Sequence, residues 1–241
     1  MKTVKISALV LAMAGVFATS ANAQSAKTNA WEGAYGQVSV GYGSFTPNIG
    51  GGSASNIPLL RGGPTGSVSS SADNVNTGTD NIGVGYNFGI NSDFVLGISA
   101  AYYPGASSSA PGAFTTYPVN GGGASSIAAV QYNVKNLYSV TLNPGYVIDK
   151  DRLVYAKVGY TGTTIGLNGP TLAYSTVNLG GYTLGLGYKQ MVAQSIYLLG
   201  EFNYASYSTK NPVLTNTSGV NLTAPISGTG IDFLVGVGYR F

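Results

Sequence analysis

The last thirteen residues of the chain, 229–241, restrict the fold more than any other stretch. Every second position is apolar or aromatic, and the positions between are mostly small or polar. The apolar and aromatic set is Ile231, Phe233, Val235, Val237, Tyr239 and Phe241. A period of two is typical of a β-strand whose two faces meet different environments. This segment is therefore expected to be a strand with one apolar face.

The same alternation recurs along the chain and predicts eight strands. The other seven are centred in 31–46, 79–90, 94–102, 128–148, 154–161, 182–188 and 196–204. Three short turns are expected near 92, 150 and 192, and four long loops at 47–78, 104–127, 163–176 and 207–227. In the fourth strand, Tyr132 and Val134 are expected on the outward face with Tyr138. An even strand number with alternating long and short connections is typical of a transmembrane barrel.

The composition favours a barrel in lipid over a barrel in water. Charged residues make up 8% of the chain, against about 25% in an ordinary soluble domain. A soluble eight-stranded barrel is the alternative, but its inner face is the apolar one. Here the large apolar residues share a face with the terminal Tyr239 and Phe241, and many opposite positions are Gly, Ser, Thr or Asn. The aromatic residues gather near both strand ends, as expected at two lipid–water interfaces.

The N-terminus has the pattern of a secretory signal peptide. Lys2 and Lys5 precede an apolar run that is too short to span a bilayer, and the small residues Ala21 and Ala23 mark a cleavage site. Residues 1–23 are predicted to be removed. The mature domain is then 24–241, a single β-barrel domain.

The opening of the mature chain, WEGAYGQVSVGYGSF, and the terminal Phe241 resemble the OmpA-like and opacity-type barrels of bacterial outer membranes. The resemblance implies an all-β, eight-stranded antiparallel up-and-down transmembrane β-barrel in the outer membrane. It also implies that Phe241 is an assembly signal read by the barrel-insertion machinery. The expected partners are that machinery and outer-membrane lipid, and a monomer is expected. The family includes structural barrels, adhesins and small channels.

The sequence excludes several kinds of chemistry. It contains no His and no Cys, so catalytic sites that use imidazole, and zinc or haem sites ligated by His, are excluded. Glu201 and Asp232 form the one inward carboxylate pair, and their expected depths differ. The mature chain carries nine basic and eight acidic residues, which argues against nucleic acid as a partner. We expect no enzyme, no cofactor and no metal.

A few charged residues are expected inside the barrel: Lys157, Lys189, Glu201, Asp232 and Arg240. Lys157 and Glu201 are candidates for an interior ion pair, with Arg240 as a second candidate partner of Glu201. An isolated interior charge is costly unless it is paired or hydrated. The pair is interpreted either as an ion gate or as structural filling of a narrow lumen.

One apolar cluster interrupts the polar segment 47–78. Ile57, Leu59 and Leu60 lie in it, and exposed apolar clusters often mark contact sites. The alternative is that they fold back onto the barrel rim or the lipid interface. The expected role is structural or adhesin-like, through four external loops that contact a surface ligand. The alternative role is a small passive porin-like channel for ions or small solutes.

Overall fold

A computed structural model describes residues 29–57, 65–105, 109–118 and 126–241, so the predicted signal peptide lies outside it. Within these residues the chain forms a single sheet of thirteen strands. The strands are β1 (Gly33–Ile49), β2 (Gly52–Ser55), β3 (Thr65–Ala72), β4 (Val75–Gly89), β5 (Phe94–Tyr103), β6 (Ser109–Pro118), β7 (Ser126–Asp149), β8 (Arg152–Gly169), β9 (Leu172–Met191), β10 (Ile196–Lys210), β11 (Val213–Thr215), β12 (Asn221–Thr223) and β13 (Ile226–Arg240). In the described part of the chain, no helix is long and apolar enough to cross a membrane.

Eight strands of this sheet close into a barrel, as the sequence predicted. Their order is β7-β5-β4-β1-β13-β10-β9-β8, and pairing of β7 with β8 closes the ring. The C-terminal strand β13 lies between β1 and β10, all antiparallel. Closure gives each of the eight strands a paired neighbour on both sides, which is the condition for a sheet to stand in lipid. The fold class is therefore confirmed.

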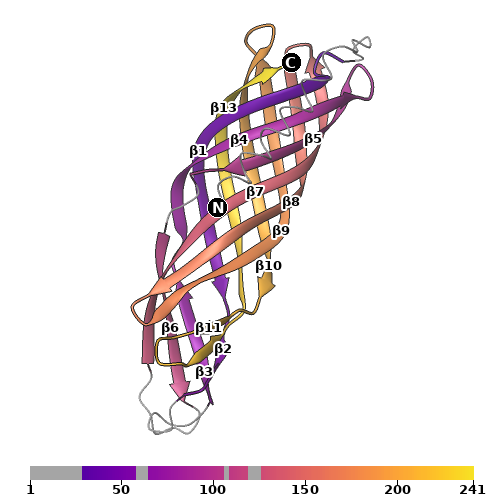
Figure 1. The fold of residues 1–241 in the computed structure, drawn as a ribbon. Coiled ribbons are helices and arrows are strands. Elements are labelled where there is room, and N and C mark those ends of the chain that lie inside the picture. The colour runs from indigo at the N-terminus through magenta and orange to yellow at the C-terminus, as the bar shows by residue number, and fades with distance from the viewer. Residues whose placement is uncertain (1–28, 58–64, 106–108, 119–125) are drawn as a thin grey trace, which may run out of the picture.

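The barrel has two unlike ends (Figure 1). At one, here called the turn end, three short connections at 90–93, 150–151 and 192–195 join the strands, as predicted. The C-terminus lies at this end. In the connection at 150–151, Arg152 Nε donates to Asp149 Oδ2 at 2.7 Å, and this hydrogen bond lowers the pKa of the Asp149 carboxyl.

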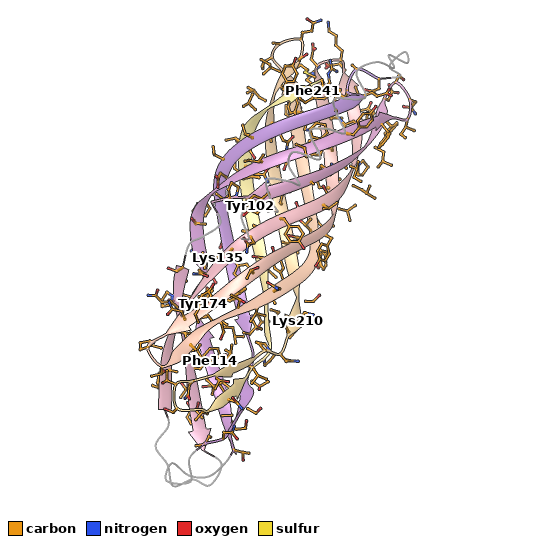
Figure 2. All side chains as sticks on the ribbon, viewed as in Figure 1. Tyr102, Phe114, Lys135, Tyr174, Lys210 and Phe241 are labelled. Atoms are coloured by element: carbon orange, nitrogen blue, oxygen red, sulfur yellow. The ribbon has the colours of Figure 1, made fainter. Side chains whose placement is uncertain are left out.

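The outward face of the barrel carries two aromatic belts with an aliphatic band between them. The belt at the turn end includes Tyr86, Phe88, Phe94, Tyr146, Tyr188, Tyr239 and Phe241. The second belt includes Tyr42, Tyr102, Tyr138, Tyr160, Tyr182 and Tyr204. In Figure 2, Phe241 lies at the turn end and Tyr102 lies farther along the barrel. Between the belts, Val40, Ile98 and Leu186 are exposed apolar side chains, as a lipid-facing band requires.

Beyond the second belt the sheet continues as an extension, made of β2, β3, β6, β11, β12 and the distal parts of β7, β8 and β9. In this region the strands pair in the order β11-β12-β2-β3-β6-β7-β8-β9. A bridge between Leu172 and Asn216 brings β9 back to the β11–β12 hairpin. The prediction of four irregular loops at 47–78, 104–127, 163–176 and 207–227 is therefore wrong, because most of their described residues are strands. Most of their outward positions are Ser, Thr, Asn or Gly, which obscured the period of two.

In the extension, the inward face is apolar and the outward face is mostly polar, which is the reverse of the lipid-facing part of the barrel. On β8, the inward side chains are Lys157, Thr161 and Thr163, and then Ile165 and Leu167, all buried. The extension thus has a continuous apolar core, as a soluble barrel does. The core contains Phe45, Ala54, Ile57, Val68, Val75, Ala110, Phe114, Val130, Tyr132, Val134, Ile165, Leu167, Leu172, Val177, Leu179, Tyr207, Leu214, Val220, Leu222, Ala224 and Ile226.

A bulge in β7 corrects the predicted orientation of two side chains. Tyr132 and Val134 are 2% and 7% exposed and point inward, not outward. The register with β8 shifts between Lys135 and Tyr138, and Asn136 has a φ of 52°. An extra residue in one strand exchanges the faces on either side of it. Tyr138, on the other side of the bulge, points outward as predicted.

Candidate functional site

The barrel lumen contains a buried ion pair between two of the candidate site residues. Lys157 Nζ on β8 is 2.7 Å from Glu201 Oε2 on β10, although β9 separates the two strands. The side chains are 7% and 3% exposed. Both carboxylate oxygens are used, because Oε1 accepts hydrogen bonds from the hydroxyl of Tyr155 (2.5 Å) and from Gln37 Nε2 (3.2 Å). Such additional hydrogen bonds offset the cost of burying a charge pair.

Arg240, the second candidate partner of Glu201, is not brought to it. Residue 240 is paired with Tyr35 near the turn end, whereas Glu201 is paired with Leu234. Six residues of strand separate these positions, or about 20 Å. Arg240 Nη2 instead donates to the carbonyl oxygen of Gln194 at 3.4 Å.

Lys189, the other interior lysine on the turn side, lies in a cage of three tyrosine rings. Its Nζ is 3.7 Å from the ring centroid of Tyr35, 4.8 Å from that of Tyr197 and 5.1 Å from that of Tyr155. An ammonium group over aromatic faces is stabilised by the ring quadrupoles, and more strongly when it is desolvated. The cage is joined to the ion pair, since the Tyr155 hydroxyl bonds Glu201 and the Tyr197 hydroxyl donates to Gln37 Oε1 at 3.1 Å.

Glycines on neighbouring strands make room for this cage. Tyr155 is paired with Gly187, Tyr197 with Gly238, and Tyr35 with a third glycine on β4. A Cβ added at Gly187 or Gly238 would lie within 2.2 Å of the facing tyrosine ring. Each ring therefore lies flat across a strand that has no side chain at that position.

The ion pair and the side chains hydrogen-bonded to it form a polar layer across the lumen. Apolar or aromatic clusters fill the lumen on both sides of this layer. At the turn end, the ring of Trp31, 1% exposed, packs edge-on against Tyr197 with centroids 5.8 Å apart. The whole turn-end cluster is Trp31, Tyr35, Val95, Val147, Leu153, Tyr155, Tyr197 and Leu199. At the other end lies the apolar core of the extension. The polar layer between them also holds a hydrogen-bonded group in which Asn143 Nδ2 donates to Ser99 Oγ at 2.8 Å.

Between the polar layer and the extension core lies a cavity of about 70 Å³. A water occupies about 30 Å³ of liquid volume, so this is room for about two water molecules. Apolar walls come from Phe45, Val75 and Leu137, and hydroxyl groups from threonines of several strands. Asp232 also lines the cavity and accepts a hydrogen bond from Asn203 Nδ2 at 2.8 Å.

The remaining candidate residues have separate positions. Phe241 is 69% exposed, its ring is 5.0 Å from that of Tyr239, and its backbone N–H donates to the carbonyl of Ala34. Ile57 is not an exposed contact residue, because it is 6% exposed and packs in the extension core. Leu59 and Leu60 lie outside the described residues.

Sequence reasoning did not predict the tyrosine cage or the cavity, and it also missed the extension core, for which one signal was present. Inward positions continue into the predicted loops with the same parity and change from polar to apolar, as from Thr163 to Ile165. The part of the chain that the structure describes contains no group of three or more acidic side chains that could hold a metal ion. The lumen is built from paired and caged charges between two apolar fillings.

Comparisons with known proteins place the chain in a family. A family model described as "Outer membrane protein beta-barrel domain" matches residues 9–241, while no curated protein matches the sequence. Among solved structures, OprG from Pseudomonas aeruginosa is 12% identical with a TM-score of 0.49, covering 87% of this chain and 97% of its own. The protease OmpT from Escherichia coli is 11% identical with a TM-score of 0.49, covering 86% and 96%.

The attachment invasion locus protein Ail of Yersinia pestis is 15% identical with a TM-score of 0.41, covering 87% of this chain and 99% of its own. At these scores the assignment depends on the family model, which spans nearly the whole chain. The chain belongs to the outer membrane protein β-barrel domain family, and its place is the bacterial outer membrane.

Proposed function

We propose that this outer-membrane barrel is a non-enzymatic surface protein whose extension makes contacts outside the cell. The observation that carries the proposal is the extension itself, in which paired strands surround an apolar core beyond the second aromatic belt. Between Tyr138, in that belt, and Ser126, β7 continues for twelve residues, or about 40 Å along the strand. An extension with strands of this length and a packed core is stiff, and it holds its tip away from the lipid.

The contact surface is expected at the tip rather than at Ile57. Tyr117 and Ile127 are 47% and 69% exposed, and they lie beside the connection between β6 and β7. Their strands are paired with each other, and Tyr117 is also paired with Ser67 on β3. Exposed large apolar side chains near one strand end favour contact with another surface.

The test is cell-surface binding by a bacterium that displays the wild-type protein or the Tyr117→Ser, Ile127→Ser double variant. Autoaggregation and binding of whole cells to a glycan array and to immobilised matrix proteins are measured. Wild-type cells should bind at least one of these surfaces, and the double variant should lose most of that binding. The matched control is Tyr174→Ser, which removes an exposed tyrosine (57%) from a different hairpin and should retain binding.

A second candidate function is a small passive channel, favoured by the polar layer and the cavity in the lumen. The filled ends of the lumen oppose it, as does the barrel size, since eight strands leave an interior that side chains can fill. Planar-bilayer recordings and liposome swelling with small sugars distinguish the two roles. We expect no sugar uptake and at most small, intermittent ion conductance. Steady large conductance with sugar uptake by a monomer would establish the channel instead.

A further inference from the structure

The bulge in β7 turns Lys135 to the outside of the barrel, just beyond the second aromatic belt. Strict alternation from the outward Tyr138 would point Lys135 into the apolar core, but the register shift between the two residues gives that place to Val134. The Nζ of Lys135 lies instead over the exposed ring of Tyr174, 5.6 Å from its centroid. In Figure 2, Lys135 lies between Tyr102, in the second belt, and Tyr174. The bulge therefore puts a positive charge at the outer edge of the lipid–water interface.

Lys135 is the first member of a row of polar side chains that crosses three strands. It is paired with Thr164 on β8, and Thr164 is paired with Asn178 on β9. Thr164 Oγ1 donates to Asn178 Oδ1 at 2.9 Å, and Asn136 Nδ2 donates to Thr164 Oγ1 at 3.4 Å. Asn178 is exposed, and its Nδ2 is left to donate outward. The row therefore offers an ammonium group at one end and amide N–H donors at the other, two strand spacings or about 10 Å apart.

Two tyrosines of the belt bring hydroxyl groups up to this row. From the row toward the belt, the next outward positions are Gly162 on β8 and Gly180 on β9. A Cβ added at Gly162 would meet the ring and the hydroxyl of Tyr138, and one added at Gly180 would meet the hydroxyl of Tyr160. The glycines thus leave the space in which the two rings lie. Hydroxyl, amide and ammonium groups together form one polar patch at the border of the lipid.

The face that carries this patch has positive charge without a counter-charge. The parts of β7, β8, β9 and β10 at or beyond the belt are 126–138, 160–182 and 204–210, and they contain two lysines, Lys135 and Lys210, and no acidic residue. In the described chain, neither lysine takes part in an ion pair. A lysine beside a membrane surface attracts anionic lipid headgroups, and charge-assisted hydrogen bonds to phosphate oxygens are strong. The chemistry of this face therefore suits a phosphate-bearing headgroup.

We propose that this patch binds the phosphorylated sugar headgroup of an outer-leaflet lipid. Lys135 and the amide of Asn178 donate to the phosphate oxygens, and Asn136, Thr164 and Tyr160 offer hydrogen bonds to the sugar hydroxyls. The belt marks the depth of the lipid–water interface, so the headgroups of that leaflet lie directly against the row. The choice of the outer leaflet rests on the extension being outside the cell, as in the proposed function. Binding of the lipid itself does not depend on any contact at the tip.

The test is native mass spectrometry of the purified, folded protein in dodecyl maltoside, titrated with lipid A that carries both of its phosphates. Dephosphorylated lipid A has the same acyl chains without the charge, and glucosamine 1-phosphate is a soluble sugar phosphate. Saturable binding of the phosphorylated lipid is expected, with the dephosphorylated lipid bound much more weakly. Lys135→Gln should weaken binding about 5-fold, the effect of one lysine beside an anionic lipid. Asn178→Asp, which replaces the amide donors by a negative charge, should weaken it at least as much.

A matched control separates the patch from general attraction between lysines and phosphate. Lys150→Gln removes a lysine from an exposed connection at the turn end and should leave the affinity unchanged. Heat-modifiable gel mobility verifies that each variant is folded. Equal affinity in Lys135→Gln, equal binding of the dephosphorylated lipid, or an equal loss in Lys150→Gln would each overturn the proposal. Full competition by glucosamine 1-phosphate would also overturn it, because the site would then take free sugar phosphates rather than a membrane lipid.

Discussion

Breaking the interior ion pair gives the sharpest test of how the lumen is stabilised. Glu201→Gln keeps the shape of the side chain but removes the counter-charge of Lys157, whose Nζ is 2.7 Å from the carboxylate. Leaving one buried partner unpaired costs on the order of 3–5 kcal/mol. Lys157→Met should cost less, about 2–3 kcal/mol, because Tyr155 and Gln37 still donate to Glu201 and hydrogen bonds to charged groups are worth about 1.5–3 kcal/mol.

The double variant should recover part of the loss, because the charge of Lys157 that Glu201→Gln leaves unpaired is removed as well. We expect a coupling free energy of about 2–3 kcal/mol between the two positions. Urea unfolding in lipid vesicles measures it, with fluorescence of Trp31, the one tryptophan of the sequence, as the signal. Trp31 is 1% exposed and lies in the turn-end cluster, so unfolding moves it into water.

The pair Asp149 and Arg152 provides a matched control for the cycle. These residues form an ion pair in an exposed turn, and exposed pairs contribute little. The corresponding variants Asp149→Asn, Arg152→Met and the double variant should show a much smaller coupling free energy. If the effects of Glu201→Gln and Lys157→Met are strictly additive, the two side chains do not stabilise each other and the argument is refuted.

Four further predictions concern other parts of the barrel. Asn136→Val should destabilise the protein by about 1–3 kcal/mol because β-branched residues disfavour a φ of 52°, whereas Asn136→Gly should be tolerated in the same urea assay. Gly238→Ala should displace the Tyr197 ring and shift the emission of Trp31, with Gly200→Ala, where a Cβ meets nothing within 4 Å, as control. Phe114→Ala should cost about 3–5 kcal/mol and make the extension sensitive to protease while the transmembrane barrel stays resistant. Deletion of Phe241 should leave more protein unfolded in the periplasm during high expression, measured by protease sensitivity, and an unchanged yield of folded barrel would count against its assembly role.

Much of the transmembrane barrel could be predicted because lipid imposes a strict alternation. Val38, Val40 and Tyr42 face outward on one strand and Ile231, Phe233 and Val235 on its neighbour, and each set is visible in the sequence. The strands of the extension were not predicted, because their outward positions face water and most of them are Ser, Thr, Asn or Gly rather than large apolar residues. The bulge at Asn136 was not predicted either, because one inserted residue hardly changes the composition of a strand.

The interior was predictable in part. Parity on the strands placed Lys157 and Glu201 inside, and the structure brings them together. Arg240 shares the inward parity of Glu201, but parity carries no information on depth. Depth depends on the register between β10 and β13, which follows from pairing across the whole sheet. The cage around Lys189 required the positions of three tyrosines and three glycines on different strands, so no local pattern showed it.

The apolar core of the extension also limits how the exposed part of the protein can change during evolution. On an irregular surface loop, almost any residue can be replaced when an immune system or a phage selects against it. Here, Val68 packs inside, while Ser67 and Ser69 on either side of it are exposed. Tolerated variation should therefore fall on every second position of each strand. Escape from an antibody or a phage receptor-binding protein would then proceed through the Ser, Thr and Asn positions, with the core left intact.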